Sequence, residues 1–479
     1  MGHKEKKVLF FIFTFLVVIR LYQIGVPPLE IEESWRQADT ESMAWNFANY
    51  DFNPFRPNLN YDGPFPNIPA LEIQVTTYLI AILYKIFGHH YFLARLVPLS
   101  FFLVSAWFLY LLARRHLSKR AAIISLLIYG ILPVNVYYSR AIMPESAALM
   151  FWLGGIYYFD RGIEKRGKGL LGLSALFFSL ALMTKPPVVV ALIPMLYLCL
   201  LYRGRKGLKL PELWIYGLLI FALPAIYYYF SIQIAEYKFA VGITKDILWK
   251  EALHAFYSPE AGAFLRTNIP KTIGFLSLIL TLGGLFFVRK KNLFLPVFLA
   301  AMVLEVILIV LAIRATYYLI FFSVPCALLS GLFLDRLVEV KGKAVLTVLI
   351  MGMMLESYIQ VQGMFRINEV MAVQTQVVRE VTAEDDLLVV GSFDPCVLSL
   401  TDRRGWRYNL NIYASLPEDP YQELDYYIER GAKYFIPIQG KVYGDEDGRL
   451  INYLERKFPK IEVKPGYPVY VLRNSSQNK

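Results

Sequence analysis

The sequence predicts a polytopic α-helical membrane protein that ends in a soluble α/β domain. Of its 479 residues, 56% are hydrophobic and only 18% are charged, whereas ordinary soluble domains carry about 25% charged residues. Apolar runs long enough to cross a bilayer, which takes roughly 20 residues, recur from residue 8 to residue 360. Beyond that point the apolar runs shorten. We therefore predict a membrane module at 1–360 and a soluble domain at 361–479.

Short basic loops separate the apolar runs and predict the orientation of the chain. They are RRHLSKR (114–120), DRGIEKRGKG (160–169), RGRKGLK (203–209), RKK (289–291) and DRLVEVKGK (335–343). Basic loops face the cytoplasm, and all five do so only if residues 71–87 form a juxtamembrane helix within a long first outer loop. This predicts about eleven spans in the cell membrane, a cytoplasmic N-terminus and an extracytoplasmic C-terminal domain; an even count is the alternative. The net charge of +11 then reflects topology rather than nucleic-acid binding.

The C-terminal segment has the pattern of an α/β domain. Helix-like stretches at 369–383, 417–430 and 448–458 alternate with strand-length runs at 387–393, 434–438 and 469–472. The segment contains neither GxGxxG nor a P-loop, so nothing in it indicates nucleotide binding. Asn474 begins a glycosylation sequon. The three cysteines show no metal-ligand spacing and share no short loop, which argues against disulfides.

The first outer loop carries an unusual concentration of charge, in EIEESWRQADTESMAWNF (30–47). If residues 33–47 form a helix, Glu33, Arg36 and Asp39 share one face, with Met43 a turn further on. Charges beside hydrocarbon are costly and need a reason. Two carboxylates and a guanidinium can bind a phosphate or a cation and still offer a general base. The alternative is an amphipathic interfacial helix with internal salt bridges.

Two later outer turns add further candidates. Arg140 and Glu145 lie in YYSRAIMPES, where Glu145 follows Pro144 in the first turn of a helix. The helix dipole alone can account for an acid at that position, and orienting an acceptor or a cation is the functional reading. Lys185 interrupts the apolar stretch LMTKPPVVV. It either extends to the membrane surface or binds a phosphate as a point charge.

Three more residues, Arg314, Tyr317 and Glu72, complete the predicted site. Arg314 lies in AIRATYYLIFF, with Tyr317 close by. A guanidinium matches a phosphate bidentately, while an aromatic-belt anchor is the alternative. Glu72 opens the juxtamembrane helix, where an acid also favours the helix N-terminus. Glu305 falls in the middle of a predicted span, and the pattern offers no reason for it.

These motifs resemble the GT-C type membrane glycosyltransferases, in particular the superfamily of protein O-mannosyltransferases and aminoarabinose transferases (glycosyltransferase family 39 and relatives). The matching pieces run in order over about residues 20–330. They are SWRQADT, LEIQVTTYLIAILYKIFG, ARL, LARRHLSKRAA, YYSRAIMPES, ALMTKPP and RATYYL. WRQADT together with SRxxMPE is fairly specific, and the other pieces are weak singly.

The resemblance implies an inverting sugar transfer from a polyprenyl-phosphate donor on the non-cytoplasmic face, without a nucleotide at the site. It implies that Asp39 is the leading candidate base, that Glu145 matches the family's acid in the second outer turn, and that Lys185 and Arg314 lie near the lipid phosphate. Many relatives carry an Asp-Glu pair early in the first loop, where this chain has Glu32 and Glu33. The choice between Glu33 and Asp39 as base therefore stays open.

The predicted function is transfer of a sugar from a polyprenyl-phosphate donor to a glycan, lipid or protein acceptor. The alternatives are a transporter or flippase of a lipid-linked or anionic substrate, and a non-catalytic subunit that binds partners through its tail. Transport favours polar residues in the middle of the membrane and internal repeats, and no repeat is apparent. No cofactor is indicated with certainty; two carboxylates can work with or without a divalent metal ion, so the metal is undecided.

Overall fold

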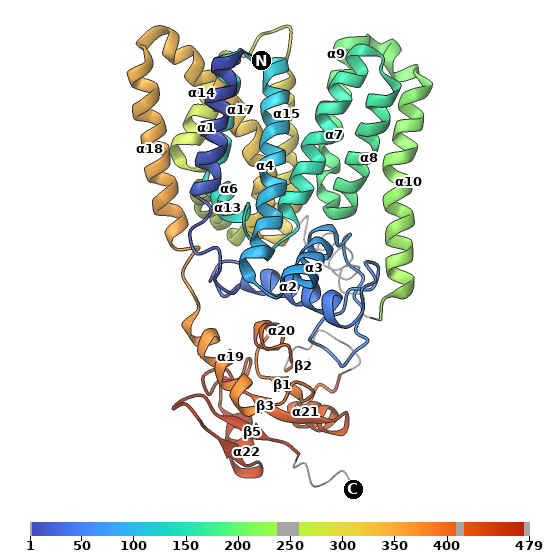
Figure 1. Cartoon of the computed structure of the whole chain (residues 1–479), viewed down its shortest axis with the longest axis vertical. Helices are drawn as coiled ribbons and strands as arrows, with labels where there is room; N and C mark the ends of the chain where they lie inside the picture. Colours follow the sequence, from blue (N-terminus) through green and yellow to red (C-terminus); the bar gives the residue numbers. More distant parts are fainter. Residues whose placement is uncertain (1, 237–257, 409–415, 474–479) are drawn as a thin grey trace.

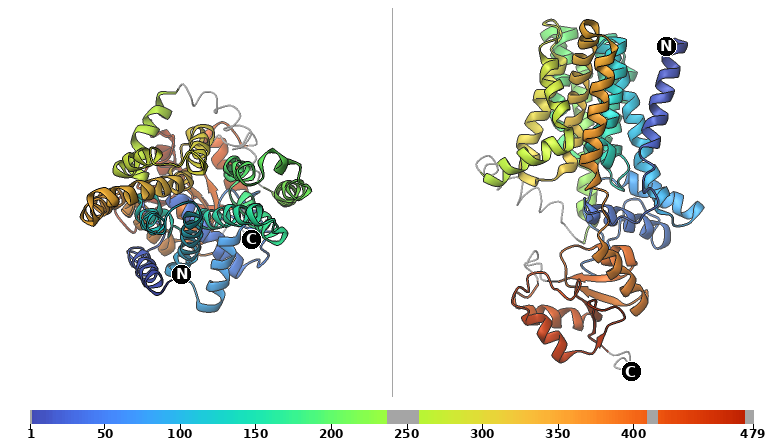
Figure 2. Two further views of the ribbon diagram at one scale, coloured as in Figure 1. Left: turned by 90° about the horizontal axis from the view of Figure 1, so that it is seen from above. Right: turned by 90° about the vertical axis from the view of Figure 1, so that its left-hand side faces the viewer.

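The computed structural model describes residues 2–236, 258–408 and 416–473. A helical bundle, a thin layer of short helices and loops, and a small sheet domain follow one another along the long axis (Figures 1 and 2). The N-terminus lies at the far end of the bundle, and the C-terminus lies at the opposite end of the molecule (Figure 1). The sequon at Asn474 falls outside the described residues, and so do residues 237–257, which precede α13.

The bundle is built from the helices that the apolar runs predict. Its α-helices are α1 (His3–Val18), α4 (Tyr91–His116), α5 (Lys119–Ile131), α6 (Pro133–Tyr138), α7 (Glu145–Lys165), α8 (Lys168–Thr184), α9 (Leu192–Arg203), α10 (Pro211–Ile234), α13 (Pro259–Ile273), α14 (Phe275–Leu285), α15 (Phe294–Glu305), α16 (Leu311–Ile313), α17 (Leu319–Lys341) and α18 (Lys343–Gln362). Short 3-10 helices join some of these helices, namely η1 (Pro186–Ala191), η2 (Gly204–Lys209) and η5 (Thr316–Tyr318), and η4 (Val306–Val310) is a π-helix.

The chain is a multi-pass membrane protein. Among the described residues six helices are long and apolar enough to cross a membrane, or seven if a bent pair counts as one span. The expected number of about eleven includes shorter helices, such as α1 with 16 residues and α8 with 17. The bent pair is α13 and α14, which meet at an angle of 89°. Gly274 makes this break with a φ of 85°, which glycine adopts without steric cost.

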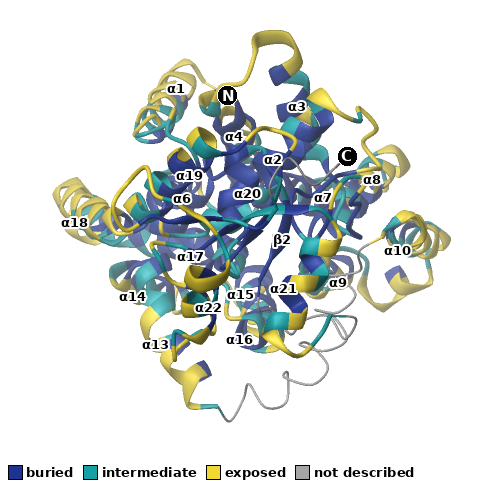
Figure 3. Cartoon of the chain, turned by 90° about the horizontal axis from the view of Figure 1, so that it is seen from below, coloured by how far each residue is buried: buried dark blue, intermediate teal, exposed yellow. Residues whose placement is uncertain are grey.

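Burial separates the inner from the outer helices. Figure 3 shows α17, α6 and α7 mostly buried at the centre, and exposed faces on α1, α10 and α18 at the periphery. The exposed residues of the outer helices are largely apolar, including Trp214 and Leu218 of α10 and Val348 of α18. Such faces are stable against lipid, because acyl chains are as apolar as the side chains themselves.

A layer beneath the bundle contains α2 (Ser34–Asn49) and α3 (Val75–Phe87). The two helices pack together through Phe47 and Ile80, and against α4 through Leu93. The prediction that residues 71–87 form a helix beside the bundle rather than within it agrees with this arrangement (Figure 1). The Pro- and Asn-rich stretch between the two helices is irregular, because proline removes backbone donors and fixes φ.

The C-terminal region is the predicted α/β domain. Its five strands have the order β2-β1-β3-β5-β4, in which β1 is parallel to β2 and β3 while β5 is antiparallel to its neighbours. The strands are β1 (Leu387–Val390), β2 (Arg404–Arg407), β3 (Ala432–Ile436), β4 (Lys460–Ile461) and β5 (Val469–Val471), and the helices are α19 (Glu369–Val381), α20 (Cys396–Thr401), α21 (Pro420–Glu429) and α22 (Arg449–Lys457). The sequence pattern did not predict β2, β4 and α20, because β2 is rich in arginine and the other two are very short.

The C-terminal domain and the first outer loop share one hydrophobic core. Met43 of α2 and Leu59 of the loop belong to the same buried cluster as Val390 of β1 and Leu398 of α20. The loop also forms backbone bridges to Gly405 of β2. A Cβ atom at Gly405 would lie 1.8 Å from the carbonyl oxygen of Leu388 in β1, so only glycine allows β2 to approach β1 at this point. The domain therefore holds the first loop in place.

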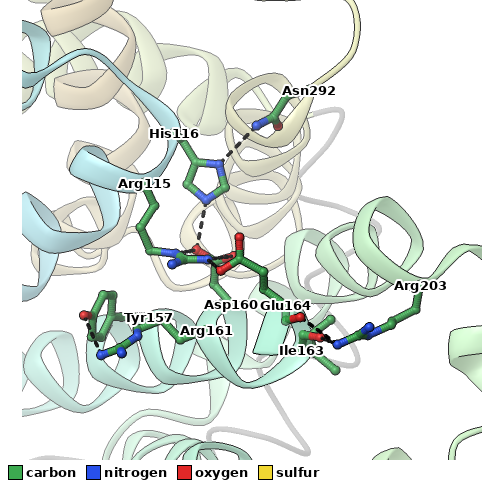
Figure 4. A network of polar contacts seen from close by, with 9 residues as sticks. All are labelled: Arg115, His116, Tyr157, Asp160, Arg161, Ile163, Glu164, Arg203 and Asn292. Carbon is green, nitrogen blue, oxygen red and sulfur yellow. Dashed lines mark hydrogen bonds and ion pairs between the residues drawn. The ribbon is translucent and has the colours of Figure 1, made fainter. Parts of the chain in front are cut away.

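The basic loops meet at the end of the bundle that carries the N-terminus. Arg115 and His116 bind Asp160, and Arg115 also binds Glu164 at 2.9 Å (Figure 4). Arg203 donates to the carbonyl oxygen of Glu164 at 2.7 Å. A second set of contacts joins Arg120 to Asp335. The prediction that these loops share one side is thus consistent with the fold, while their cytoplasmic location stays a prediction.

Candidate active site

At the opposite end of the bundle, a cavity of about 690 Å³ lies between the helical bundle and the α2 layer. Its walls come from segments far apart in the chain: α2, the first-loop stretch before α3, the turn before α7, the α8–η1 junction, α10 and the α16–η5 turn. Predicted site residues line it from four of these segments, namely Glu33, Arg36, Asp39, Glu72, Lys185 and Tyr317. The expected convergence of distant polar residues is present.

Helix α2 presents its charged face to this cavity. Arg36, Asp39, Thr40 and Met43 all line it, as expected for residues three and four apart on one helix. Glu33 precedes the helix with a φ of 56° and a ψ of 34°. A non-glycine residue in this left-handed conformation costs about 1 kcal/mol or more and is often found at functional sites.

Alternating charges link three residues of the cavity wall, Glu72, Arg36 and Lys185, through the buried Glu145. Glu72 Oε1 lies 2.6 Å from Arg36 Nη2, and Arg36 Nε lies 3.7 Å from Glu145 Oε1. The same oxygen of Glu145 lies 2.6 Å from Lys185 Nζ. Glu145 is fully buried and Lys185 is only 4% exposed. Buried charges require such partners, and Glu145 holds the two cations on either side of one oxygen atom.

Lys185 is positioned by the end of α8. Its backbone leaves the helix with a φ of −147°, and the prolines at 186 and 187 prevent the helix from continuing. The ammonium lies 4.9 Å from the ring centre of Tyr317 and 5.1 Å from that of Tyr318. The Arg36 guanidinium lies 5.5 Å from the same Tyr317 ring. The two cations thus share an aromatic wall, which favours positive charge by cation–π attraction.

Asp39 lies where the cavity meets the C-terminal domain. The hydroxyl of Tyr61 donates to Asp39 Oδ2 at 3.1 Å, while Oδ1 has no hydrogen-bond partner among the described residues. Burial raises the pKa of Asp39 to about 7, although the nearby Arg407 guanidinium favours the ionised form. A carboxylate with a pKa near the working pH is suited to general-base catalysis.

Glu33 has a similar acidity in a different environment. Burial raises the pKa of Glu33 to about 7, against the opposing effect of the Arg36 guanidinium, and the Glu32 carboxylate raises it further. Lys185 and Glu145 are among the charges that act on Glu33, whereas Arg407 and Asp394 act on Asp39. The Arg36 guanidinium favours the ionised form of both carboxyl groups.

The structure does not bring two of the predicted phosphate ligands to the cavity. Arg140 is buried among first-loop groups, 3.7 Å from Glu30 Oε1 and 2.9 Å from the carbonyl oxygen of Gln23. Arg314 is exposed at the end of α16 with a φ of 56°, although its neighbours Ile313 and Ala315 line the cavity. Glu72 also differs from expectation: α3 begins at Val75, so Glu72 precedes the helix and pairs with Arg36 instead of opening it.

The sequence did not predict the contacts that Glu32 and Arg407 make near the site. Glu32 accepts hydrogen bonds from Tyr138 at 3.0 Å and Thr316 at 2.9 Å, and Lys271 Nζ lies 3.1 Å from it. Arg407 of β2 binds both carboxylate oxygens of Asp62, at 3.0 and 2.5 Å. The sequence marks Glu32 and Glu33 as a pair but not these partners of Glu32, and nothing local marks an arginine nearly 370 residues after Asp39 as its neighbour.

Within the described residues, no group of three His, Cys, Asp or Glu side chains is arranged to hold a metal ion. At the cavity, Glu72 pairs with Arg36, and Glu145 pairs with Arg36 and Lys185, so the two carboxylates do not face one another. A divalent cation favours clusters of oxygen ligands, and this donor set does not supply one. We therefore assign no step to a metal.

Comparison with known proteins supports the family resemblance. Residues 74–229 match the family described as dolichyl-phosphate-mannose-protein mannosyltransferase. The fold is similar to that of ArnT from Cupriavidus metallidurans bound to undecaprenyl phosphate, with a TM-score of 0.69 and 13% identity over 98% of both chains. It is also similar to the oligosaccharyltransferase AglB from Archaeoglobus fulgidus in complex with an inhibitory peptide and a dolichol-phosphate, with a TM-score of 0.61 and 13% identity over 98% of this chain and 74% of that one.

A sequence relative comes from Aquifex aeolicus (strain VF5), where it is described as an uncharacterized protein. It is 30% identical over 216 residues, which are 45% of this chain and 45% of the relative. The matched stretch thus spans less than half of that protein. The predicted resemblance to GT-C glycosyltransferases is confirmed by the matched segment and by the fold, including the small sheet domain that follows the bundle.

Proposed function

We propose that this protein transfers a sugar from a polyprenyl-phosphate donor to an acceptor, at the cavity between the bundle and α2. One observation carries the proposal: an apolar cavity beside the membrane spans contains two paired cations and two carboxyl groups with pKa values of about 7. A lipid phosphate needs the cations, and an acceptor hydroxyl or amine needs the base.

Arg36 and Lys185 are the groups proposed to bind the donor phosphate. The phosphate is the leaving group, so negative charge accumulates on it as the bond to the sugar breaks. Cations aimed at that charge stabilise the transition state most where water is excluded. Glu145 positions both cations through one oxygen atom, so its proposed role is orientation rather than direct contact with the substrate.

Asp39 is the proposed general base. In an inverting displacement the acceptor oxygen or nitrogen attacks the anomeric carbon from the face opposite to the phosphate, and its proton passes to the base. The bond between the anomeric carbon and the phosphate oxygen breaks with its electron pair retained by the phosphate. Asp39 Oδ1 has no partner among the described residues, and Asp39 lines the same cavity as the two cations, which supports this role. Glu33 is the alternative base, because its pKa is also near 7.

The prenyl chain of the donor fits the apolar side of the cavity. Tyr228 and Ile232 of α10 and Ile313 of α16 line it, and α10 has a largely exposed apolar surface toward the membrane. A lipid can thus place its phosphate at the cations while its tail stays among spans. With the basic loops in the cytoplasm, the reaction takes place on the extracytoplasmic side of the cell membrane.

Transport of a lipid-linked or anionic substrate is the second candidate function. Glu305 of α15 favours it, because this carboxyl is buried within the bundle and one of its oxygens has no hydrogen-bond partner among the described residues. Intramembrane acids often mark transport pathways. The other polar residues instead gather at the end of the bundle, which favours the transferase.

The test is to incubate purified protein with a panel of polyprenyl-phosphate sugars and membrane extracts as acceptor, and to follow release of free polyprenyl phosphate. Release with at least one donor, accompanied by labelled acceptor, is expected. A flippase would move labelled donor across proteoliposomes without releasing its phosphate. Absence of release with every donor, while movement across the bilayer is observed, would overturn the transferase in favour of the transporter.

A further inference from the structure

A second cavity lies on the other face of α2. It has a volume of about 380 Å³ and is enclosed by α2, the α3–α4 turn and the C-terminal domain. An α-helix has about 3.6 residues per turn, so Glu41 and Trp45 point away from Arg36, Thr40 and Met43. Glu41 and Trp45 line the second cavity, whereas the latter three line the first. Helix α2 thus separates two distinct cavities.

The Glu41 carboxylate is held in place through only one of its two oxygen atoms. It is only 3% exposed. Its Oε1 atom accepts a hydrogen bond from the Tyr84 hydroxyl at 2.9 Å and lies 2.6 Å from His89 Nε2. In the described part of the chain Oε2 has no such contact. This second oxygen can therefore accept a hydrogen bond from a donor in the cavity.

Aromatic rings form one wall around this carboxylate. The His89 ring packs edge-on against Trp45 at 4.9 Å and against Tyr91 at 4.9 Å. The indole nitrogen of Trp45 donates to Asp402 Oδ2 at 2.6 Å, which fixes the ring relative to the C-terminal domain. Rings held in this way offer rigid apolar surface with a polar edge.

The C-terminal domain supplies hydrogen-bonding groups opposite that wall. Arg379 of α19 donates to the carbonyl oxygen of Leu400 and also bonds to the Tyr91 side chain. Because a guanidinium has five N–H groups, others remain for a ligand in the cavity that Arg379 lines. Ser399 is only 4% exposed, and its hydroxyl has no hydrogen-bond partner among the residues described. Both residues line the same cavity as Glu41, so acceptor and donor groups face one space.

The charged side chains that line this cavity favour one class of ligand. Three carboxylates and two guanidinium groups line the cavity, from Glu41, Glu384, Asp402, Arg379 and Arg403. A phosphate would favour an excess of cations, and a metal ion would favour a cluster of carboxylates. A neutral polyol satisfies both signs, since each hydroxyl donates to one group and accepts from another, while its apolar ring face packs on the aromatic wall.

We propose that this second cavity is a saccharide-binding site that takes a neutral sugar unit. Its ligands are the Glu41 carboxylate, the Arg379 guanidinium and the Ser399 hydroxyl, with Trp45 and Tyr91 as the packing surface. Binding at this site stands independently of the transfer reaction, because it uses none of the residues that line the first cavity.

The test measures binding of maltose, lactose, cellobiose and chitobiose to the purified full-length protein in detergent, by saturation-transfer NMR. At least one disaccharide is expected to bind, and inorganic phosphate is not expected to compete with it. Glu41→Gln and Arg379→Gln are each expected to weaken binding about tenfold or more, because each removes a charge-assisted hydrogen bond. Thermal unfolding of each variant verifies that it is folded, and the two variants lie on different elements, so one suffices if the other is unstable.

Two controls define the outcomes. Glu380→Gln makes the same chemical change on the exposed face of α19, and Asp39→Asn alters the first cavity. Both are expected to bind the disaccharide as the unaltered protein does. Three outcomes would overturn the proposal. None of the four sugars binds, or binding is unchanged in both Glu41→Gln and Arg379→Gln, or binding is lost in Asp39→Asn alone.

Discussion

The two ends of the helical bundle both bury charged side chains, but they use them differently. At the end that carries the N-terminus, Asp160 accepts from Arg115 and His116, and Glu164 binds Arg115 (Figure 4). At the other end, Glu145 pairs with Arg36 and Lys185 beside a cavity of about 690 Å³. The first set joins helices to one another, and the second set surrounds a space.

The difference lies in how completely the carboxylates are bonded. Both oxygens of Asp160 accept hydrogen bonds from side chains. Asp39 has an oxygen with no partner among the described residues, and it lines the cavity together with Glu33. Satisfied polar groups stabilise the fold, while unsatisfied groups at a cavity have capacity left for a ligand. The following changes test this comparison, from the largest expected effect on activity to the smallest.

Asp39→Asn is expected to lower the rate of sugar transfer by about 10² to 10⁴-fold, the usual contribution of a general base. The side chain keeps its shape, and Tyr61 can still donate to the amide oxygen, so the fold is retained. The measurement is the single-turnover rate with saturating donor. If Glu33→Gln shows the large loss and Asp39→Asn does not, the base is Glu33; near-normal rates in both variants would contradict a carboxylate base in this loop.

Lys185→Met is expected to raise KM for the lipid donor by about 10- to 100-fold, because it removes a charged hydrogen-bond donor from the proposed phosphate site. It also leaves Glu145 without its shorter ion pair, and breaking a buried pair costs about 3–5 kcal/mol of stability.

The double variant Lys185→Met/Glu145→Gln separates these two effects. It removes the unpaired charge, so the melting temperature is expected to recover while KM stays high. Recovery of KM together with stability would show that Lys185 serves the fold rather than the phosphate.

The dependence of the rate on pH is expected to reflect the raised pKa of the base. Because the ionised carboxylate is the active form, kcat/KM should rise about tenfold per pH unit below pH 7 and level off above it. Arg407 favours the ionised form of Asp39, so Arg407→Gln should move this rise to higher pH. A profile that is flat between pH 5 and pH 8 would exclude both Asp39 and Glu33 as bases with a pKa of about 7.

Stability should show the opposite trend over the same range. The pKa of Asp39 is about 7 in the folded protein and near 3.8 when the chain is unfolded. Between these values the folded state retains a proton that the unfolded state has released, so this group makes the protein less stable as pH rises from about 4 to 7. Melting curves of Asp39→Asn should lose that component, and an identical pH dependence in the variant would contradict the raised pKa.

Asp160→Asn is expected to change activity least and stability strongly. Asp160 is fully buried and pairs with Arg115 and His116, so neutralising it should cost about 3–5 kcal/mol. The transfer rate per folded molecule and KM should stay unchanged. A large rise in KM in this variant, with stability preserved, would remove the distinction between the two ends.

Much of this architecture can be predicted from local sequence. The apolar runs locate nearly every helix of the bundle because burial in lipid demands continuous apolar residues. Spacing places Arg36, Asp39 and Met43 on one face of α2, since helical periodicity is a local property. The bend at Gly274 lies where the mixed polar and apolar sequence of α13 gives way to the apolar α14, so a change of composition marks its position but not its angle.

The site is only partly predictable for the same reason. Lys185 stands out because a charge within an apolar stretch is costly. Arg140 and Arg314 carry the same signal, yet one pairs with Glu30 and the other is exposed. A sequence shows that a charge needs a partner, but not which partner it finds.

The amino-acid sequence by itself determined that the chain crosses the membrane many times, that its basic loops share one end, and that an α/β domain follows. These properties depend on composition and on periodicity along a single segment. Only the tertiary structure decided that Glu145 lies between Arg36 and Lys185, and that Arg407 of the C-terminal domain acts on Asp39. Those contacts join residues that are distant in the chain, so they exist only after the helices and the sheet have packed.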